Sequence, residues 1–244
     1  MKNPHLDIDR ISDEYGRDGV TRVRGFFPAA LISEVKAALD RYIKETVPDL
    51  PPGDCIYESD GVSVRNLFRM EHHDQYFSNL ARLDFVHDLV SRLVHGEPEL
   101  IQVETFNKPA RTGSGVPWHQ DNAYFCLAPP DAITVWIAID PATIENGAVY
   151  YLRGRQEELL PHTPSGVTGN SMGLAQSPDV PLEEQFCGDL EPGDALLHHC
   201  QIPHRSDPNT TGQSRCGFLM VFRGTHTKRV PTLAAEYRQA HKTP

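Results

Sequence analysis

Apolar residues in the first third of the chain recur at the spacing of a helix. From Leu31 to Ile43 they stand three and four residues apart, which places them on one helix face that can be buried. Pro48 ends this helix, because the residue before a proline is pushed out of the helical conformation. A second helical pattern begins near Asp84, a candidate N-cap, and stops at Gly96. The N-terminal part is therefore predicted to be helical.

The pattern changes after residue 99 to short runs that suit β-strands. These runs are apolar or alternating, and Gly and Pro clusters separate them without intervening helices. Strands in this arrangement indicate an antiparallel sandwich or barrel. The runs cover residues 100–107, 133–139, 148–152, 195–200 and 216–222. Residues 160–184 are rich in Pro, Gly, Ser and Thr, and we expect a lid or mouth loop there.

No repeat or flexible linker divides the chain, so we expect a single domain over residues 1–244. Its parts are a helical region over about residues 1–98, a β core over about 99–225 and a tail over 226–244. This length suits one β domain, because sandwiches and barrels run to about 200–250 residues. The sequence makes no prediction of the oligomeric state.

Acidic residues outnumber basic residues, which narrows the choice of partners. The chain has 33 Asp and Glu against 23 Lys and Arg, a net charge of −10 with His neutral. Without a basic cluster, this balance argues against nucleic acid and anionic membranes as partners. No stretch approaches the roughly 18 apolar residues of a membrane span. The five cysteines form no CxxC pair, so we expect no disulfide framework and a cytoplasmic location.

His119 and Asp121 are the first candidate metal ligands. They are separated by one residue, and side chains at positions i and i+2 of an extended chain point to the same face. A His-x-Asp pair on a strand suits the set of two histidines and one carboxylate that binds non-haem iron(II). Zinc sites more often use two histidines one helical turn apart, or cysteine pairs.

A third ligand is expected in the C-terminal segment, where residues 207–212 have the composition of a turn. If this turn closes a symmetric hairpin, His204 stands opposite Arg215, and Ser206 shares their face. A buried guanidinium needs an anion and binds a carboxylate through two hydrogen bonds, to which Ser206 can add a third. These groups indicate a ligand that chelates a metal at one end and carries a carboxylate at the other, as 2-oxoglutarate does.

His198 and His199 are alternatives to His204 as the distal histidine. Adjacent residues on a strand face opposite sides, so at most one of these two points inward. Neither stands eleven residues before an arginine, as His204 does before Arg215. We therefore favour His204.

The residues around these candidates resemble the phytanoyl-CoA dioxygenase family, a branch of the iron(II)/2-oxoglutarate oxygenases that includes the ectoine hydroxylases. The family motif WHQD is present at residues 118–121. Its distal motif, His-x-Ser-x-Pro-Asn with Arg eleven residues after the His, is present from His204 to Arg215. FNKPA at 106–110, TVWIAID at 134–140 and ENGAVYYL at 145–152 extend the resemblance, which covers roughly residues 60–222. The combination is far more specific than any one motif.

The resemblance implies a mainly β (α+β) fold, a double-stranded β-helix of jelly-roll type with buttressing N-terminal helices. It also implies that His119, Asp121 and His204 hold iron(II) and act catalytically. Arg215 and Ser206 are then expected to bind the cosubstrate 2-oxoglutarate, with O2 as the second cosubstrate. Asn107, Trp136 and Thr134 are expected to line the cosubstrate pocket.

The reaction implied by the resemblance is hydroxylation of an unactivated C–H bond of a small molecule, with succinate and CO2 as co-products. Asp121 favours hydroxylation, because related halogenases lack this carboxylate so that chloride can bind. Two other functions stay open: a cupin-type metal enzyme that does not use 2-oxoglutarate, and a catalytically silent metabolite-binding protein. Residues 153–156, expected near the mouth, read RGRQ where many relatives have Pro-Gly-Ser-His, so no relative's substrate is carried over.

Overall fold

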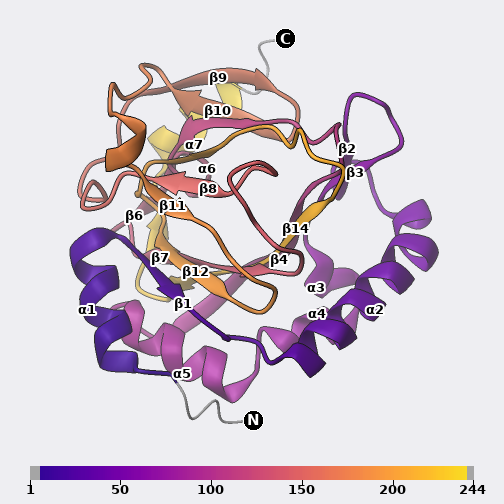
Figure 1. The fold of residues 1–244 in the computed structure, drawn as a ribbon. Coiled ribbons are helices and arrows are strands. Elements are labelled where there is room, and N and C mark those ends of the chain that lie inside the picture. Colours follow the sequence, from indigo (N-terminus) through magenta and orange to yellow (C-terminus); the bar gives the residue numbers. More distant parts are fainter. Residues whose placement is uncertain (1–5, 241–244) are drawn as a thin grey trace.

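Two antiparallel sheets face each other in the structure, a computed structural model that describes residues 6–240 (Figure 1). The larger sheet has the strand order β1-β12-β7-β14-β4-β3-β2, and the smaller has the order β11-β8-β13-β5. Two short pairs, β9 with β10 and β6 with β15, lie outside these sheets. The strands are β1 (Val20–Val23), β2 (Cys55–Tyr57), β3 (Val64–Leu67), β4 (Pro98–Lys108), β5 (Val116–His119), β6 (Leu127–Ala128), β7 (Ala132–Ala138), β8 (Val149–Tyr151), β9 (His162–Val167), β10 (Asn170–Leu174), β11 (Phe186–Gly188), β12 (Ala195–His199), β13 (His204–Ser206), β14 (Arg215–Gly224) and β15 (Lys228–Arg229).

Helices pack against one face of the larger sheet and leave its other face to the smaller sheet. The helices are α1 (Ile8–Asp18), α2 (Ala29–Glu45), α3 (Met70–His73), α4 (Gln75–Leu80), α5 (Asp84–Leu93), α6 (Asn122–Phe125) and α7 (Pro231–Ala240), with 3-10 turns at η1 (Val47–Asp49) and η2 (Leu182–Glu184). Val35 of α2 and Leu89 of α5 are fully buried against the sheet. Each such side chain contributes about 1.5–3 kcal/mol through burial of apolar surface.

Strand β7 of the larger sheet is buried on both of its faces. All seven of its residues are buried. Because side chains alternate along a strand, Val135 and Ile137 join the core under the helices, whereas Thr134 and Trp136 point toward the smaller sheet. A strand that is buried on both faces is a continuous apolar run, which is why the sequence pattern predicts it.

The predicted helices and strands are present, with small shifts at their ends. Helix α2 ends at Glu45 and is followed by a 3-10 turn that contains Pro48. Asp84 is the first residue of α5, and the N-cap is Leu83 instead. The five predicted strands are β4, β7, β8, β12 and β14.

Three expectations about the outline of the chain need correction. The region expected to be helical also contains β1 at one edge of the larger sheet, and β3 and the edge strand β2 on its other side. Residues 160–184, expected to form a lid or mouth loop, contain the β9–β10 hairpin and η2. The expected tail contains β15 and α7, and its residues 241–244 lie outside the described residues. The missed strands β1, β2, β3 and β15 have two to four residues each and lie outside any longer apolar run, so no pattern marks them in the sequence.

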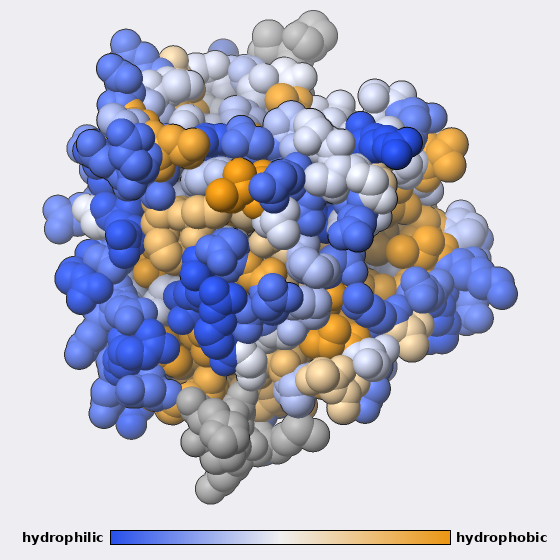
Figure 2. All heavy atoms as spheres, viewed as in Figure 1, coloured by the Kyte–Doolittle hydropathy of each residue, from blue (hydrophilic) through white to orange (hydrophobic). Residues whose placement is uncertain are grey.

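Charged and polar side chains cover most of the face shown in Figure 2, and apolar side chains appear there in separate patches. The five cysteines are free, as the sequence predicted. Within residues 6–240, no helix has the length and apolar character that a membrane crossing requires.

Gly193 precedes β12 and allows a close backbone contact. Its φ is +92°, and an added Cβ would lie 2.3 Å from the carbonyl oxygen of Phe27. Gly53 has almost the same φ, +93°, with open space around it. Both alanine variants therefore carry the cost of positive φ, about 1–2 kcal/mol, but only Gly193→Ala meets a backbone atom.

We expect Gly193→Ala to lower the free energy of unfolding by at least about 1 kcal/mol more than Gly53→Ala does. Urea denaturation of both variants measures the difference. Equal losses would mean that the contact with Phe27 does not constrain the turn.

Candidate metal centre

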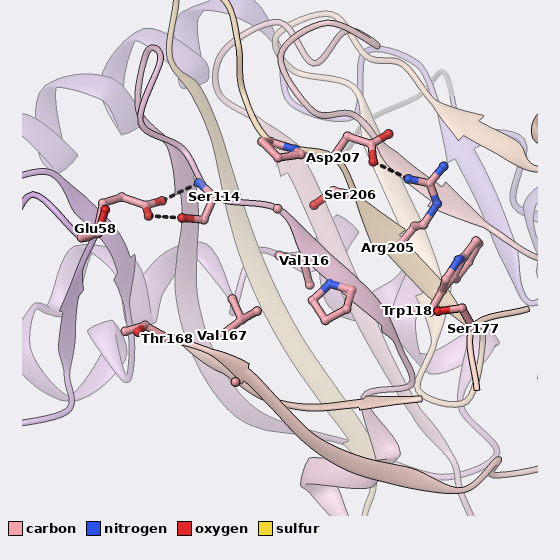
Figure 3. Close-up of a pocket in the computed structure, with 15 residues that line it drawn as sticks. Glu58, Ser114, Val116, Trp118, Val167, Thr168, Ser177, Arg205, Ser206 and Asp207 are labelled. Atoms are coloured by element: carbon pink, nitrogen blue, oxygen red, sulfur yellow. Dashed lines mark hydrogen bonds and ion pairs between the residues drawn. The ribbon is translucent and has the colours of Figure 1, made fainter. Parts of the chain in front are cut away.

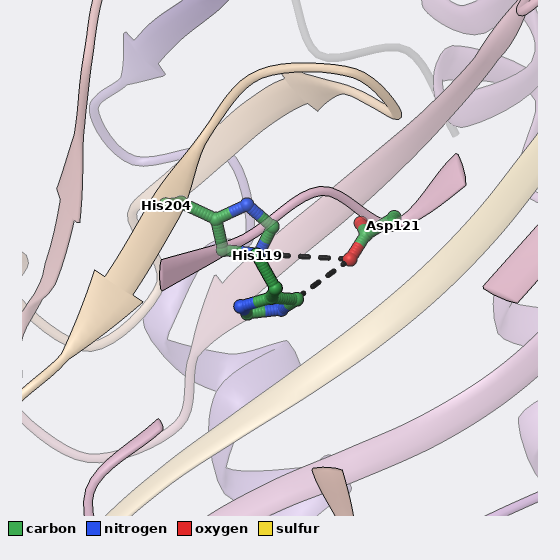
Figure 4. A group of neighbouring side chains, drawn as sticks. All are labelled: His119, Asp121 and His204. Carbon is green, nitrogen blue, oxygen red and sulfur yellow. Dashed lines mark ion pairs between the residues drawn. The ribbon is translucent and has the colours of Figure 1, made fainter. Parts of the chain in front are cut away.

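His119, Asp121 and His204 bring their side chains together between the two sheets (Figure 4). Their ligand atoms all lie within 4.8 Å of one another. His119 on β5 and His204 on β13 are directly opposite each other, with ring centroids 4.0 Å apart. Asp121 Oδ1 lies 3.6 Å from Nε2 of each histidine. The three predicted ligands thus converge on one point.

The backbone element that positions Asp121 differs from the predicted strand. Strand β5 ends at His119, and Asp121 is the N-cap residue of α6, with a helical φ of −60°. The turn into α6, and not strand alternation, therefore directs the carboxylate. Gln120 anchors this turn, because its buried amide donates to the backbone oxygens of Glu158 and Gln201.

Backbone carbonyls fix the orientation of both histidine rings. His119 Nδ1 lies 2.9 Å from the oxygen of Pro117, and His204 Nδ1 lies 3.0 Å from the oxygen of Ile202. A carbonyl only accepts hydrogen bonds, so we assign the proton of each ring to Nδ1, which leaves the Nε2 lone pair free. Histidines that bind metals are oriented in this way.

The second oxygen of Asp121 is held by the larger sheet. Thr134 Oγ1 and His198 Nε2 each lie 3.2 Å from Oδ2. The Tyr151 hydroxyl lies 3.0 Å from His198 Nδ1, and its ring stacks on His204. His198 therefore orients the Asp121 carboxylate. His204, and not His198, is the second histidine of the cluster. His199 packs near Tyr15 instead.

The surroundings hold all three groups in the protonation states that a metal requires. Burial lowers the pKa of His119, and burial together with the neighbouring His119 lowers the pKa of His204 well below its usual value. Burial by itself raises the pKa of Asp121, but attraction to His204 and the hydrogen bond from His198 outweigh it and hold this pKa well below its usual range. Two neutral imidazoles and a carboxylate fit iron(II).

Arg215 lies in the same cavity and has no carboxylate partner among the described residues. Its side chain is buried, with Nη1 donating to the oxygen of Phe106 (3.2 Å) and Nη2 to that of Gly147 (2.9 Å). Nε has no partner within residues 6–240. Burial lowers the pKa of Arg215 to about 10, so the group stays charged at neutral pH. A buried cation of this kind favours an anionic ligand.

The predicted hairpin between His204 and Arg215 is wrong. Strand β13 pairs with β5 and β8 in the smaller sheet, and β14 pairs with β4 and β7 in the larger one. Arg215 stands opposite Lys108, because residues 207–214 carry the chain from one sheet to the other. Ser206 and Arg215 nevertheless line one cavity, since the two sheets face each other.

Trp136, Thr134 and Asn107, which were expected to line the cosubstrate pocket, also line this cavity. The Trp136 ring lies under the guanidinium of Arg215, 5.1 Å from its central carbon. A Cβ on Gly217 would lie 2.3 Å from this ring, so the close packing requires glycine. Asn107 has a structural bond as well, because its amide donates to the Val64 oxygen at 2.8 Å.

Lys108 is a cavity residue that the sequence analysis missed. It is 3% exposed, and Nζ donates to the Ser114 oxygen at 2.5 Å. Burial, with repulsion from Arg215 and Arg65, lowers its pKa to about 6. The available signal was a lysine at the end of a predicted strand, on the face opposite the apolar core.

Glu104 was missed as well, although it lies on the same face of β4 as Lys108. It is 6% exposed, and Gln102 Nε2 donates to its Oε2 at 2.8 Å. Burial raises its pKa to about 8, and repulsion from Asp121 and Glu71 adds to this. The polar residues at alternate positions of this strand were the signal that the face borders a cavity.

The cavity has a volume of about 1000 Å³ and opens beneath the β9–β10 hairpin. Tyr124 of α6 ties the hairpin down, because its hydroxyl contacts Asn170 Oδ1 and donates to the Met172 oxygen at 2.7 Å. Residues 160–184 thus contribute to the mouth as expected. The expectation for residues 153–156 is wrong, since Gly154 and Gln156 contact α1 and do not line the cavity.

A more open cavity of about 560 Å³ adjoins the first on the outer side of β5 and β13 (Figure 3). Glu58 accepts hydrogen bonds from Ser114 N and Oγ, at 3.0 and 2.6 Å. Arg205 Nη1 lies 2.6 Å from Asp207, and its guanidinium packs on the Trp118 ring. Glu58 and Arg205 thus already have polar partners, so the outer cavity has, among the described residues, no free charged group like Arg215 that could bind a ligand.

The fold is that of known 2-oxoglutarate-dependent enzymes. The epimerase SnoN from nogalamycin biosynthesis, described as alpha ketoglutarate dependent, superposes with a TM-score of 0.73 and 20% identity, over 97% of this chain and 91% of SnoN. EctD from S. alaskensis, solved with 2-oxoglutarate and 5-hydroxyectoine, gives 0.76 and 17%, over 92% and 79%. At these identities the likeness shows the fold alone, and it confirms the predicted jelly roll.

The family model for phytanoyl-CoA dioxygenase (PhyH) matches residues 15–217. The chain therefore belongs to the phytanoyl-CoA dioxygenase family, and the predicted class, an iron(II)- and 2-oxoglutarate-dependent dioxygenase, is confirmed. L-proline trans-4-hydroxylase from Streptomyces griseoviridis is 26% identical over 238 residues, 89% of this chain and 87% of that protein. 2-Aminoethylphosphonate dioxygenase from an uncultured bacterium is 26% identical over 211 residues, 84% and 77% of the two chains.

The raised pKa of Glu104 makes the stability of the metal-free protein depend on pH. The carboxyl group has a pKa of about 8 in the folded protein against an ordinary value of 4.5. Between these values the folded state binds a proton that the unfolded chain has released, so this contribution is fully present below pH 4.5 and is lost as the pH rises toward 8.

We expect the unfolding free energy of the metal-free wild type to fall by at least about 1 kcal/mol relative to Glu104→Gln when the pH is raised from about 6 to about 8.5. Urea denaturation at the two pH values measures this difference. Glu99→Gln, an exposed position on the same strand, is the control and should follow the wild type. Parallel pH curves for wild type and Glu104→Gln would contradict the raised pKa.

Proposed function

We propose that this protein hydroxylates an unactivated C–H bond of a small molecule, with iron(II) held by His119, Asp121 and His204. In this proposal Arg215 and Ser206 bind the distal carboxylate of 2-oxoglutarate. Trp136, Thr134 and Asn107 line the cosubstrate pocket, and Lys108 adds a further buried donor beside Arg215. Bound iron(II) and 2-oxoglutarate supply the chemistry, in which O2 converts 2-oxoglutarate to succinate and CO2 and delivers its second oxygen atom to the C–H bond.

One observation carries the proposal: the His-Asp-His cluster and an unpaired buried guanidinium share a single cavity. A cupin-type enzyme that binds a metal without 2-oxoglutarate has no use for Arg215, and the family membership disfavours it further. A catalytically silent binding protein has the same cavity, so only turnover separates it from an oxygenase.

The residues of the chain orient the reactants and limit access of water. Thr134 and His198 hold Oδ2 of Asp121, which leaves Oδ1 directed at the two Nε2 atoms. The guanidinium of Arg215 is held in place by two carbonyl oxygens and by the Trp136 ring. Preorganised donors of this kind bind a carboxylate without rearrangement. The β9–β10 hairpin covers the cavity and shields reactive species from solvent.

A small-molecule substrate fits the cavity volume of about 1000 Å³. The cytoplasmic location and the single-domain organisation stay predictions from the sequence.

The proposed activity is tested by loading the protein with iron(II) anaerobically and adding 2-oxoglutarate and O2. We expect slow release of succinate, stimulated by a substrate found in a panel of acyl-CoA compounds, amino acids, sugar acids and phosphonates. Asp121→Ala should abolish the release. The product of a hydroxylase gains one oxygen atom, whereas an epimerised product keeps its mass. Binding of 2-oxoglutarate without any succinate would identify a silent protein.

We expect His204→Ala to lower the affinity for iron(II) by at least about 100-fold, because one of three protein ligands is lost. Anaerobic titration calorimetry measures the affinity. His199→Ala is the matched control, since its ring lies outside the cluster and its loss should leave binding unchanged. Retention of full affinity by His204→Ala would assign the role to another histidine.

We expect Arg215→Ala to raise the dissociation constant of 2-oxoglutarate by at least about 30-fold, because the carboxylate loses a buried charged partner. The affinity for iron(II) should change less than about threefold. Arg223→Ala, at a half-buried position of the same strand that pairs with Glu99 outside the cavity, should alter neither value. A parallel loss of iron in Arg215→Ala would show that Arg215 supports the metal cluster instead.

A further inference from the structure

Glu104 is a buried carboxyl group in the cavity that neither the metal cluster nor the proposed cosubstrate site uses. It stands opposite Leu219 on β14, which stands opposite Trp136 on β7. The neighbouring row is Gln102, Val221 and Thr134, and Thr134 contacts Asp121. Glu104 on β4 is therefore two strands, roughly 10 Å between backbones, from the strand β7 that carries Thr134, and it lines the same cavity as the metal cluster.

The cationic end of the cavity is distant from Glu104. Lys108 stands opposite Arg215 in the strand register and is four residues further along β4 than Glu104. On an extended strand this places their backbones roughly 13 Å apart. A 2-oxoglutarate that extends from the cluster to Arg215 thus leaves Glu104 on the side where a second molecule can bind. The carboxyl group belongs to the space for the primary substrate.

Glu104 has no positively charged partner among the residues that the structure describes. Its one hydrogen bond within residues 6–240 comes from the neutral amide of Gln102 to Oε2. The charged groups that act on it, Asp121 and Glu71, are both carboxylates and repel it. A buried carboxylate without a neighbouring cation destabilises the folded protein. A ligand that supplies the cation offsets this destabilisation.

Among the described residues, no arginine that lines the cavity forms an ion pair with Glu104. Three of these arginines already have carboxylate partners: Arg65 with Glu58, Arg69 with Asp54 and Arg205 with Asp207. Arg215 lies at the other end of the cavity, and Arg229 lies at an exposed position of β15. Phe68 and Phe106, which pack edge to face, line the cavity near Glu104 and add an apolar wall. An apolar wall beside one carboxyl group suits an alkylammonium ion.

From this geometry we infer that the primary substrate carries a cationic group, of the class of a protonated amine, that pairs with Glu104 while the carbon to be oxidised lies at the metal cluster. The inference rests on the proposed function and specifies its substrate. Because Thr134, two strands from Glu104, contacts Asp121, we expect a small amine with only a few atoms between the cation and the reacting carbon.

The test compares three probes of one shape and different charge: cyclopentylamine, cyclopentanol and cyclopentanecarboxylate. Their affinities are measured by calorimetry on the anaerobic protein loaded with iron(II) and 2-oxoglutarate, so that no turnover is needed. We expect the wild type to bind the amine at least about tenfold more tightly than the alcohol, because the hydrogen bond is charge-assisted and buried. The carboxylate should bind most weakly.

Glu104→Gln keeps the size of the side chain and should reduce the preference for the amine to less than about twofold. Glu99→Gln, on the same strand but outside the cavity, should retain the wild-type preference. The affinity for 2-oxoglutarate should be equal in the wild type, Glu104→Gln and Glu99→Gln. Thermal unfolding verifies that the variants are folded, and Glu104→Asp, which keeps the charge, should retain part of the preference.

Several results would overturn the inference: equal binding of amine and alcohol by the wild type, tightest binding of the carboxylate, or an unchanged preference in Glu104→Gln. Weaker binding of 2-oxoglutarate to Glu104→Gln would assign the carboxyl group to the cosubstrate instead. Failure of the proposed function is visible separately, as absence of 2-oxoglutarate binding in the wild type. The same probe series on the metal-free protein then still reports on Glu104, because the carboxyl group belongs to the chain.

Discussion

His119 and His204 are direct neighbours across one pair of antiparallel strands, and each ring donates from Nδ1 to the carbonyl of the residue two positions earlier. Their Nε2 atoms therefore face the same point, and neither ring can turn without losing a backbone hydrogen bond. A shift of the register by one residue would turn one of the imidazoles out of the cavity. Asp121 completes the group from the turn into α6, where Thr134 and His198 hold its second oxygen.

The second constraint is the burial of charge in one cavity. Arg215, Lys108 and Glu104 are each less than a tenth exposed, and each has a pKa displaced toward its neutral form, primarily by burial. Arg215 of β14 and the facing Lys108 of β4 lie at one end of the cavity, and Glu104 lies further along β4 on the same face as Lys108. In our proposals a dicarboxylate binds at the end with Arg215, and a cationic group binds beside Glu104.

The motifs that define the family lie on the metal and cosubstrate side of this cavity, and other elements build its remaining walls. The β9–β10 hairpin, α7 and the outward part of β4 contribute to the mouth and to the substrate side. The two similar curated proteins are named for a proline hydroxylase and an aminoethylphosphonate dioxygenase, so chains at this level of identity act on different molecules. The family motif is therefore not sufficient to identify the substrate, and in our inference Glu104 contributes to its selection.

Local patterns in the sequence were sufficient for α2, α5 and the five predicted strands, because each lies in a run with enough apolar or alternating residues to be recognised. The spacing of His119, Asp121 and His204 and the family motif identified the metal cluster as well. The sequence did not reveal that β13 and β14 belong to different sheets, since a turn composition looks the same whether it closes a hairpin or joins two sheets. Only the tertiary structure brings Lys108 and Glu104 into the cavity and His198 onto Asp121, because these contacts join strands that are far apart in the chain and depend on how the two sheets face each other.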